Sequence, residues 1–154
     1  MSASAESQWM NRATDLLGGK RVLHTDVRSP LQAHDLLTSG LPNGALISLL
    51  KHLTVLRAPD LLDTALGISL RTYQRRQVDG SKPLNAEQSA RTWKFVEILS
   101  KATEVFGSQE EAERWMERPA MALDQRRPID LMTTPAGADL VEDHLQRLDY
   151  GVYA

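Results

Sequence analysis

The chain has 154 residues, a formal net charge of −2, 42% hydrophobic residues and no cysteine. This size and apolar content predict one compact domain or two small ones and exclude wholesale disorder, while the absence of cysteine excludes disulfides and thiolate chemistry. Because the sequence shows neither a secretory signal nor the ~18 apolar residues that a membrane span needs, we expect a soluble, cytoplasmic protein without a membrane partner.

The first forty residues give a mixture of structural signals. Residues 20–27 have local β character, but the stretch is short and no other strand signal follows it. Ser29 and Pro30 have the form of a helix start, and with a glycine at the far end they predict a helix over 30–39. We interpret residues 1–41 as an N-terminal helical segment of uncertain role.

Three further helices are predicted in the next forty residues. Residues 44–56 carry leucines at intervals of three and four, which is typical of a helix with one buried face. A proline begins a second helix over 59–66, which stops at Gly67. Ser69 is placed to cap a third helix over 70–78. The last two helices, with a turn between them, have the spacing of a helix-turn-helix.

Capping signals also mark the helices of the remaining chain. Asn85 begins a long helix that reaches Phe106, and Ser108 begins the next one, each with the sequence form of a capping box. Thr134, followed by proline, caps a last helix over 135–150. We therefore predict an all-α fold. The apolar stripe of the last helix is expected to consist of Leu140, Val141, Leu145 and Leu148.

Charge is distributed unevenly along the chain. Residues 1–103 hold 13 Lys and Arg against 9 Asp and Glu, whereas residues 104–154 hold 5 against 11. Such a split indicates a basic module and an acidic module with different partners. The alternative is a solvated surface on which the charges cluster by accident.

The turn of the predicted helix-turn-helix has recognisable parts. Leu66 is expected to face the core, Gly67 to adopt a left-handed conformation, Ile68 to plug the junction and Tyr73 to face inward from the second helix. Asp63 departs from the pattern, because the motif usually carries a small residue there. Paired helices with a glycine turn also occur in proteins that bind no DNA, which is the alternative interpretation.

The second helix of this motif and the loop after it carry the candidate DNA-binding residues. Arginine can bond a guanine edge with two hydrogens, and Arg71 and Arg75 lie one turn apart, so both can project from one face. Arg76 is expected to reach a phosphate or an intramolecular partner, and Lys82 to contact the DNA backbone. The full candidate set is Ser69, Arg71, Thr72, Arg75, Arg76 and Lys82.

Residues at many fixed spacings in the C-terminal third form a further pattern. It consists of Phe106-Gly107, Ala112, Trp115, Met116, Pro119, Ala122-Leu123, Pro128-Ile129-Asp130-Leu131, Gly137, Val141, Leu145, Arg147 and Tyr150-Gly151-Val152. The pattern closely resembles the toxin-binding domain of the Xre/MbcA/ParS antitoxin family. The upstream stretches RTYQRR and LNAEQSAR fit the DNA-binding half of the same family, so the resemblance covers about residues 42–154.

The resemblance implies an antitoxin and not an enzyme. Antitoxins of this kind are encoded beside a RES-domain toxin, which resembles an ADP-ribosyltransferase and consumes NAD. They neutralise the toxin by binding it, and they repress their own operon through the helix-turn-helix. The implied organisation is a helix-turn-helix DNA-binding domain over 42–104, followed by a small helical toxin-binding domain over 105–154. We expect no cofactor, and the four scattered histidines predict no metal site.

The residues of the last helix suggest how a toxin could be neutralised. Its exposed face is expected to hold Glu142, Asp143 and Asp149, followed by a short apolar tail that ends in a carboxylate. A site for NAD phosphates is usually positive, so this acidic end could occupy it and exclude the dinucleotide. The alternative is that Tyr150 and Val152 pack back on the domain. The candidate toxin-binding residues are Asp130, Glu142, Asp143, Arg147, Asp149, Tyr150, Gly151, Val152, Tyr153 and Ala154.

Operator recognition also bears on the oligomeric state. A single helix-turn-helix rarely gives adequate specificity, whereas two copies on a twofold axis read a palindrome. We therefore expect a homodimer that forms a hetero-oligomer with the toxin, and we consider the helix over 45–56 and the helix containing Trp93 as candidate contacts. The alternatives are a transcription regulator of the same fold without a toxin partner, and a scaffold that no longer binds DNA.

Overall fold

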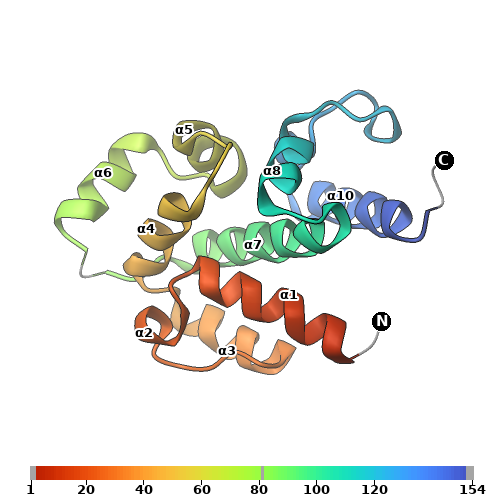
Figure 1. Cartoon of the computed structure of the whole chain (residues 1–154). Helices are drawn as coiled ribbons and strands as arrows, with labels where there is room; N and C mark the ends of the chain where they lie inside the picture. The colour runs from red at the N-terminus through yellow and green to blue at the C-terminus, as the bar shows by residue number, and fades with distance from the viewer. Residues whose placement is uncertain (1–2, 81, 152–154) are drawn as a thin grey trace.

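Helices follow one another along almost the whole chain in the computed structural model, which describes residues 3–80 and 82–151 (Figure 1). Within those ranges the β pairing is confined to an isolated bridge between Ala120 and Arg126. The predicted all-α fold is confirmed. None of the helices described is long and apolar enough to span a bilayer.

The N-terminal segment folds into three helices. They are α1 (Ala3–Leu16), α2 (Gly19–Leu23) and α3 (Pro30–Ser39). The β character of residues 20–27 is misleading, because Leu23 and Val27 reach the core from a helical turn and the loop that follows it. The predicted start of α3 is confirmed, since the Ser29 hydroxyl accepts a hydrogen bond from the backbone N–H of Gln32 at 3.2 Å.

The next helices are α4 (Asn43–His52), α5 (Ala58–Asp60), the π-helix η1 (Leu61–Leu66) and α6 (Leu70–Val78). Helix α4 ends at His52, four residues before the predicted end at Leu56. The backbone N–H groups of residues 54–56 donate to the carboxylate of Glu113 on another helix. A tertiary hydrogen bond has therefore replaced the helical ones, which the leucine spacing could not reveal.

The second half of the chain begins with α7 (Ala86–Phe106) and α8 (Gln109–Glu117), followed by η2 (Met121–Leu123), α9 (Pro128–Leu131) and α10 (Pro135–Asp149). The capping box of α7 is confirmed, because Asn85 and Gln88 exchange side chain-to-backbone hydrogen bonds. At α8, Ser108 caps as predicted, whereas the carboxylate of Glu111 binds Arg114.

Helix α7 is the central element of the bundle (Figure 1). It packs against α1 and α3 on one side and against η1, α8 and α10 elsewhere. Trp9 of α1 meets Trp93 of α7 edge to face at a centroid distance of 6.3 Å. Phe95 and Leu99 are fully buried, and one hydrophobic core runs through both halves of the chain.

Several of the residues considered as dimer contacts are buried in the core of the monomer. Leu46 and Leu49 of α4 are fully buried, and Leu56 and Trp93 are buried as well. Helix α1 lies against α4, where the Ser48 hydroxyl donates to the carbonyl of Leu16 at 3.0 Å. These leucines and Trp93 therefore belong to the core of the monomer. Of the predicted leucine stripe, only the half-buried Leu50 and Leu53 remain available for a contact between subunits, together with the exposed residues of the two helices.

Candidate functional site

The turn between η1 and α6 has the conformation that the sequence predicted. Gly67 is left-handed with φ of 66°, and its backbone N–H donates to the carbonyl of Leu62. Ile68 is 1% exposed and also donates its N–H to the Leu62 carbonyl, at 2.9 Å. Tyr73 lies on the inner face of α6 and is buried, and this burial raises the pKa of its phenol. These contacts fix α6 relative to η1.

Arg91 of α7 also supports this turn, although nothing in its sequence context indicated this role. Its Nε donates to the carbonyl of Ala65 at 2.9 Å and its Nη2 to the carbonyl of Thr64 at 3.2 Å. A Cβ added to Gly67 would lie 2.2 Å from Arg91 Nη1. The left-handed backbone angle therefore favours glycine at this turn, and a larger residue would also displace the guanidinium of Arg91.

Two of the candidate DNA-binding arginines project freely from α6. Arg71 and Arg75 are exposed, and neither forms an ion pair or side-chain hydrogen bond with the described residues. The hydroxyls of Ser69 and Thr72 are 2.9 Å apart, and Ser69 caps the helix by accepting from the N–H of Thr72. These two hydroxyls thus shape the N-terminal end of α6, where the helix is open to solvent.

Arg76 and Lys82 lie at the other end of α6. Arg76 is half-buried, and its Nη1 donates to the carbonyl of Lys82 at 3.0 Å. The amide of Asn43 donates to the carbonyl of Arg76 at 2.7 Å. Of the two roles expected for Arg76, the structure therefore contains the intramolecular partner. The side chain of Lys82 is exposed.

The departure at Asp63 has a simple structural context. Its side chain is exposed on η1, while Ala65 supplies a small residue that is 1% exposed. The side chain of Asp63 therefore points away from the contact between the two helices of the motif and does not disturb their packing.

Glu113 of α8 is a fully buried acid that sequence reasoning also missed. Its carboxylate accepts hydrogen bonds from the N–H groups of Thr54, Val55 and Leu56 at 2.8–3.0 Å, and from the amide of Gln109 at 2.7 Å. Burial alone would raise the pKa of this acid, but the hydrogen bonds hold it below its ordinary value. The only sequence signal was an acid at a core position of an amphipathic helix.

The face of α10 differs in part from the expectation. Glu142 is half-buried and lies 3.2 Å from Lys94 Nζ, so it belongs to an internal ion pair instead of a free acidic face. Burial would lower the pKa of Lys94, but Glu97 and Glu142 raise it. Asp143 is exposed and pairs with Arg147 at 3.2 Å. Leu140 is 56% exposed and so is not part of the apolar stripe.

The C-terminal end of α10 is open. Asp149 is exposed, and Tyr150 is 74% exposed instead of packing back on the domain. Gly151 is left-handed with φ of 68° and has open space around it. The predicted site residues Val152, Tyr153 and Ala154 lie outside the described residues.

Asp130 lies apart in sequence from the α10 residues and pairs locally. Its carboxylate accepts two hydrogen bonds of 2.8 Å from Arg127, at the residue that precedes α9. These bonds lower the pKa of Asp130. Helix α9 packs against η1, so this ion pair lies in an element that supports the helix-turn-helix from the C-terminal half.

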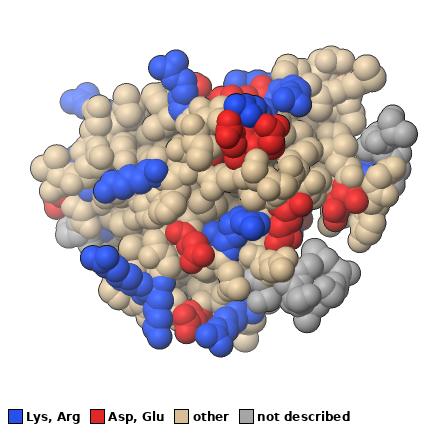
Figure 2. Space-filling model, viewed as in Figure 1, with Lys and Arg blue, Asp and Glu red and all other residues tan. Residues whose placement is uncertain are grey.

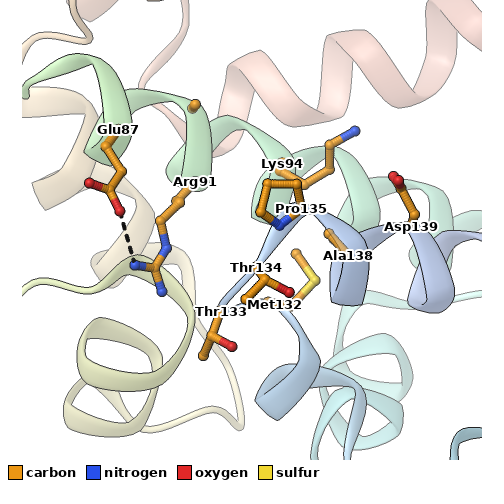
Figure 3. Close-up of a pocket in the computed structure, with 10 residues that line it drawn as sticks. Glu87, Arg91, Lys94, Met132, Thr133, Thr134, Pro135, Ala138 and Asp139 are labelled. Atoms are coloured by element: carbon orange, nitrogen blue, oxygen red, sulfur yellow. Dashed lines mark ion pairs between the residues drawn. The ribbon is translucent and has the colours of Figure 1, made fainter.

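A cavity of about 350 Å³ lies between α7 and the start of α10 (Figure 3). Met132, Pro135 and Ala138 provide its apolar wall, and the Glu87–Arg91 ion pair, with 3.9 Å between charged atoms, lies at one side. Arg91 thus contacts the helix-turn-helix turn and also lines a cavity shared with the C-terminal half.

Charge is separated on the surface as well as along the sequence. In the view of Figure 2, Lys and Arg side chains predominate on the left, where α6, α4 and α2 lie in Figure 1. Asp and Glu side chains gather to the right of centre, over α8 and α10. The two candidate surfaces therefore lie toward opposite ends of α7.

Comparisons with known proteins agree with this division. A model of the antitoxin Xre-like helix-turn-helix domain matches residues 32–97, and a model of the antitoxin Xre/MbcA/ParS C-terminal toxin-binding domain matches residues 101–151. The first match contains α6 and its turn, and the second contains α8, α9 and α10.

Curated relatives carry the name antitoxin Xre. The protein from Photorhabdus laumondii is 30% identical over 118 residues, which are 76% of this chain and 78% of that protein. The protein from Yersinia enterocolitica is 34% identical over 58% of this chain and 61% of its own length. The protein from Pseudomonas putida is 31% identical over 54% of this chain and 52% of its own length.

Proposed function

This chain belongs to the Xre/MbcA/ParS family of antitoxins, and from that premise we propose that it neutralises a RES-domain, NAD-consuming toxin and represses its own operon. It combines a helix-turn-helix DNA-binding part with a toxin-binding part. Its role is to bind and not to catalyse. We place it in the cytoplasm, where operator DNA and NAD are both present.

The proposed neutralising element is the C-terminal end of α10 with the tail that follows. An aromatic residue as exposed as Tyr150, at 74%, is typical of a surface that a partner covers. Asp149 precedes it and adds negative charge, which suits a pocket that binds the phosphates of NAD. In this proposal the end of α10 occupies that pocket and excludes the dinucleotide.

Deletion of residues 150–154 tests this mechanism. Because α10 ends at Asp149, the truncated protein should keep its helices but lose neutralisation by at least tenfold in the concentration that halves NAD loss. The assay follows NAD in the presence of the purified toxin encoded beside this gene, with circular dichroism as the check on folding. Leu31→Ser, at a similarly exposed site on α3, is the control and should neutralise normally.

A folded truncated protein that still protects NAD at the concentration of the wild type would exclude occlusion by the tail. Another surface of the C-terminal half would then carry neutralisation.

The proposed DNA-reading element is α6. Arg71 and Arg75 extend from its exposed face toward solvent, and the Gly67 turn and the buried Tyr73 hold the helix in place. An arginine on a recognition helix can read guanine with two hydrogen bonds. Ser69 and Thr72 lie at the end of α6 that enters the groove in such motifs, and Lys82 suits a phosphate contact.

Substitution of Arg71 tests base recognition. Arg71→Ala should weaken binding to the operator by about 1–3 kcal/mol and relax base choice at one position, because one bidentate contact is lost. Fluorescence anisotropy with duplexes from the upstream region, each carrying one changed base pair, measures both effects. Arg126→Ala, which removes an exposed arginine from the C-terminal half, should bind like the wild type. Unchanged affinity and base choice in Arg71→Ala would contradict this role for α6.

The boundary proposed between residues 104 and 105 separates the two proposed binding functions, but it does not separate two independently packed structural units. Helix α7 runs from Ala86 to Phe106 across it, and α9 from the C-terminal side packs against η1 of the DNA-binding side. We therefore propose that the DNA-binding part, 42–104, and the toxin-binding part, 105–154, act on different partners while sharing one core.

A further inference from the structure

The N-terminal segment, for which the sequence indicated no role, carries a group of basic residues in and after α2. Lys20 and Arg21 lie in α2 and Arg28 in the loop that follows, and all three side chains are exposed. We call these three residues the α2 basic cluster. Arg21 forms no ion pair with any of the described residues.

A chain of direct contacts joins α2 to the C-terminal end of α6. Val22 of α2 lies close against Gly44 of α4, where an added Cβ would be 3.2 Å from the Val22 side chain. The neighbouring residue, Asn43, donates to the carbonyl of Arg76 at 2.7 Å. Arg76 in turn donates to the carbonyl of Lys82 at 3.0 Å. The cluster is therefore connected through the start of α4 to the loop with the proposed phosphate contact.

The backbone that carries the α2 basic cluster is fixed by residues packed in the core. Leu23 and Val27 are each 4% exposed and fix the turn of α2 and the loop after it in the core. The Ser48 hydroxyl of α4 donates to the carbonyl of Leu16 and ties the preceding residues to α4 as well. Side chains on a fixed backbone lose less conformational entropy when they bind than side chains on a mobile tail.

One carboxylate moderates the charge of the cluster. Asp26 lies 3.8 Å from Lys20 Nζ and 3.6 Å from Arg28 Nη2, and it thus neutralises one of the three positive charges. Figure 2 shows that Lys and Arg predominate over the end of the molecule that contains α2, α4 and α6. This end presents a positive surface that extends beyond the recognition helix.

We propose that the α2 basic cluster binds the phosphates of operator DNA flanking the bases that α6 reads. The proposal rests on the DNA-binding function of α6. Duplex DNA extends past any single major-groove contact, so a positive surface beyond the end of the recognition helix meets backbone phosphates and not base edges. Such contacts fix register and add affinity without adding base preference, and each releases condensed counterions.

The double variant Lys20→Gln with Arg21→Gln tests the proposal. Its affinity for the operator should fall about three- to tenfold at moderate salt, with unchanged base preference. The slope of log affinity against log salt should become shallower by roughly 0.9 for each phosphate contact removed. Fluorescence anisotropy over a series of salt concentrations measures both quantities, and thermal unfolding shows whether the variant is folded.

Two further measurements sharpen the test. Asp26→Asn removes the neutralising carboxylate, so it should bind the operator more tightly and with a steeper salt slope. A duplex trimmed on the flanking side should bind the wild type more weakly and abolish the difference between the wild type and the double variant. The matched control Arg118→Gln with Arg126→Gln removes two exposed cations from the C-terminal half and should leave operator affinity unchanged.

The outcomes separate this proposal from the function on which it rests. If Arg71→Ala weakens binding while the double variant keeps the affinity and salt slope of the wild type, the flanking contact is wrong and recognition by α6 stands. If the double variant instead loses affinity for the toxin alone, the cluster belongs to a protein interface and the proposal is overturned. If the wild-type protein binds no operator duplex, the DNA-binding function itself fails.

Discussion

Glu113 illustrates how one side chain can determine where a distant helix ends. Three consecutive backbone N–H groups, at residues 54–56, donate to its carboxylate, so the chain after α4 is held open instead of continuing as a helix. Buried backbone donors need acceptors, and a carboxylate is the strongest acceptor available. A single acid on α8 thus connects the C-terminal half to the loop that leads into the helix-turn-helix.

Replacing Glu113 should therefore cost much stability. Glu113→Gln should lower the free energy of unfolding by about 2–4 kcal/mol at pH 7, because a neutral amide accepts these bonds less strongly and points N–H donors at other donors. Urea unfolding monitored by circular dichroism measures the change. Glu110→Gln, on the exposed side of the same helix, is the matched control and should change stability by less than about 0.5 kcal/mol.

The same variant has a predictable dependence on pH. The pKa of Glu113 in the folded protein lies below its ordinary value of 4.5, so the carboxylate stabilises the fold fully above pH 4.5 and loses its effect as pH falls through the lowered pKa. The difference between wild type and Glu113→Gln should shrink in that acidic range. A difference that is constant from pH 7 to pH 3 would show that the charge of Glu113 is not what stabilises the loop.

At the scale of the elements, local chemistry placed most helix starts correctly. Ser69, Asn85, Ser108 and Thr134 were predicted as caps and Ser29 as part of a helix start. Each of the five accepts a hydrogen bond from the first turn of its helix. A cap involves a side chain and a backbone group only a few residues apart, so the sequence itself contains both partners.

The elements that were predicted wrongly depend on distant partners. Helix α4 ends early because of Glu113, and residues 19–23 form a helix because Leu23 packs into a core built by other segments. Leu140 fits the predicted stripe of α10 by spacing, but it is 56% exposed because Gly137, Val141 and Leu145 are the positions that face α7 and its neighbours. The spacing of apolar residues narrows down which face of a helix can be buried, and the packing against other segments decides which face is buried.

At the scale of the whole molecule, α7 both separates and joins the two proposed functions. The arginine-rich helix α6 lies toward one end of α7, and the acidic end of α10 lies toward the other (Figure 1). Arg91 of α7 holds the Gly67 turn through the carbonyls of Thr64 and Ala65, and it also lines the cavity formed with residues 132–139. The same helix therefore contacts both the turn of the helix-turn-helix and the C-terminal half.

The proposed operator recognition implies a symmetric assembly of whole molecules. We predict that the protein alone sediments at micromolar concentration as a dimer, with twice the chain mass of 17.2 kDa, because two recognition helices about one DNA turn apart are needed to read a palindrome. The buried leucines of α4 cannot form this contact. A monomer in analytical ultracentrifugation, both with and without operator DNA, would contradict the prediction.

The sequence by itself determined the all-α class, most helix starts, the Gly67 turn with its buried Ile68 and Tyr73, and the family. The helix starts and the turn depend on residues near one another in the chain, and the family is indicated by residue spacings that the sequence contains in full. Only the tertiary structure decided where α4 ends, that its leucines are core, that Glu142 is paired with Lys94, and that α2 lies beside α4. Each of these features requires contacts between segments far apart in sequence. Local spacing and charge do not specify such contacts. They are specified by the packing of the whole chain around α7.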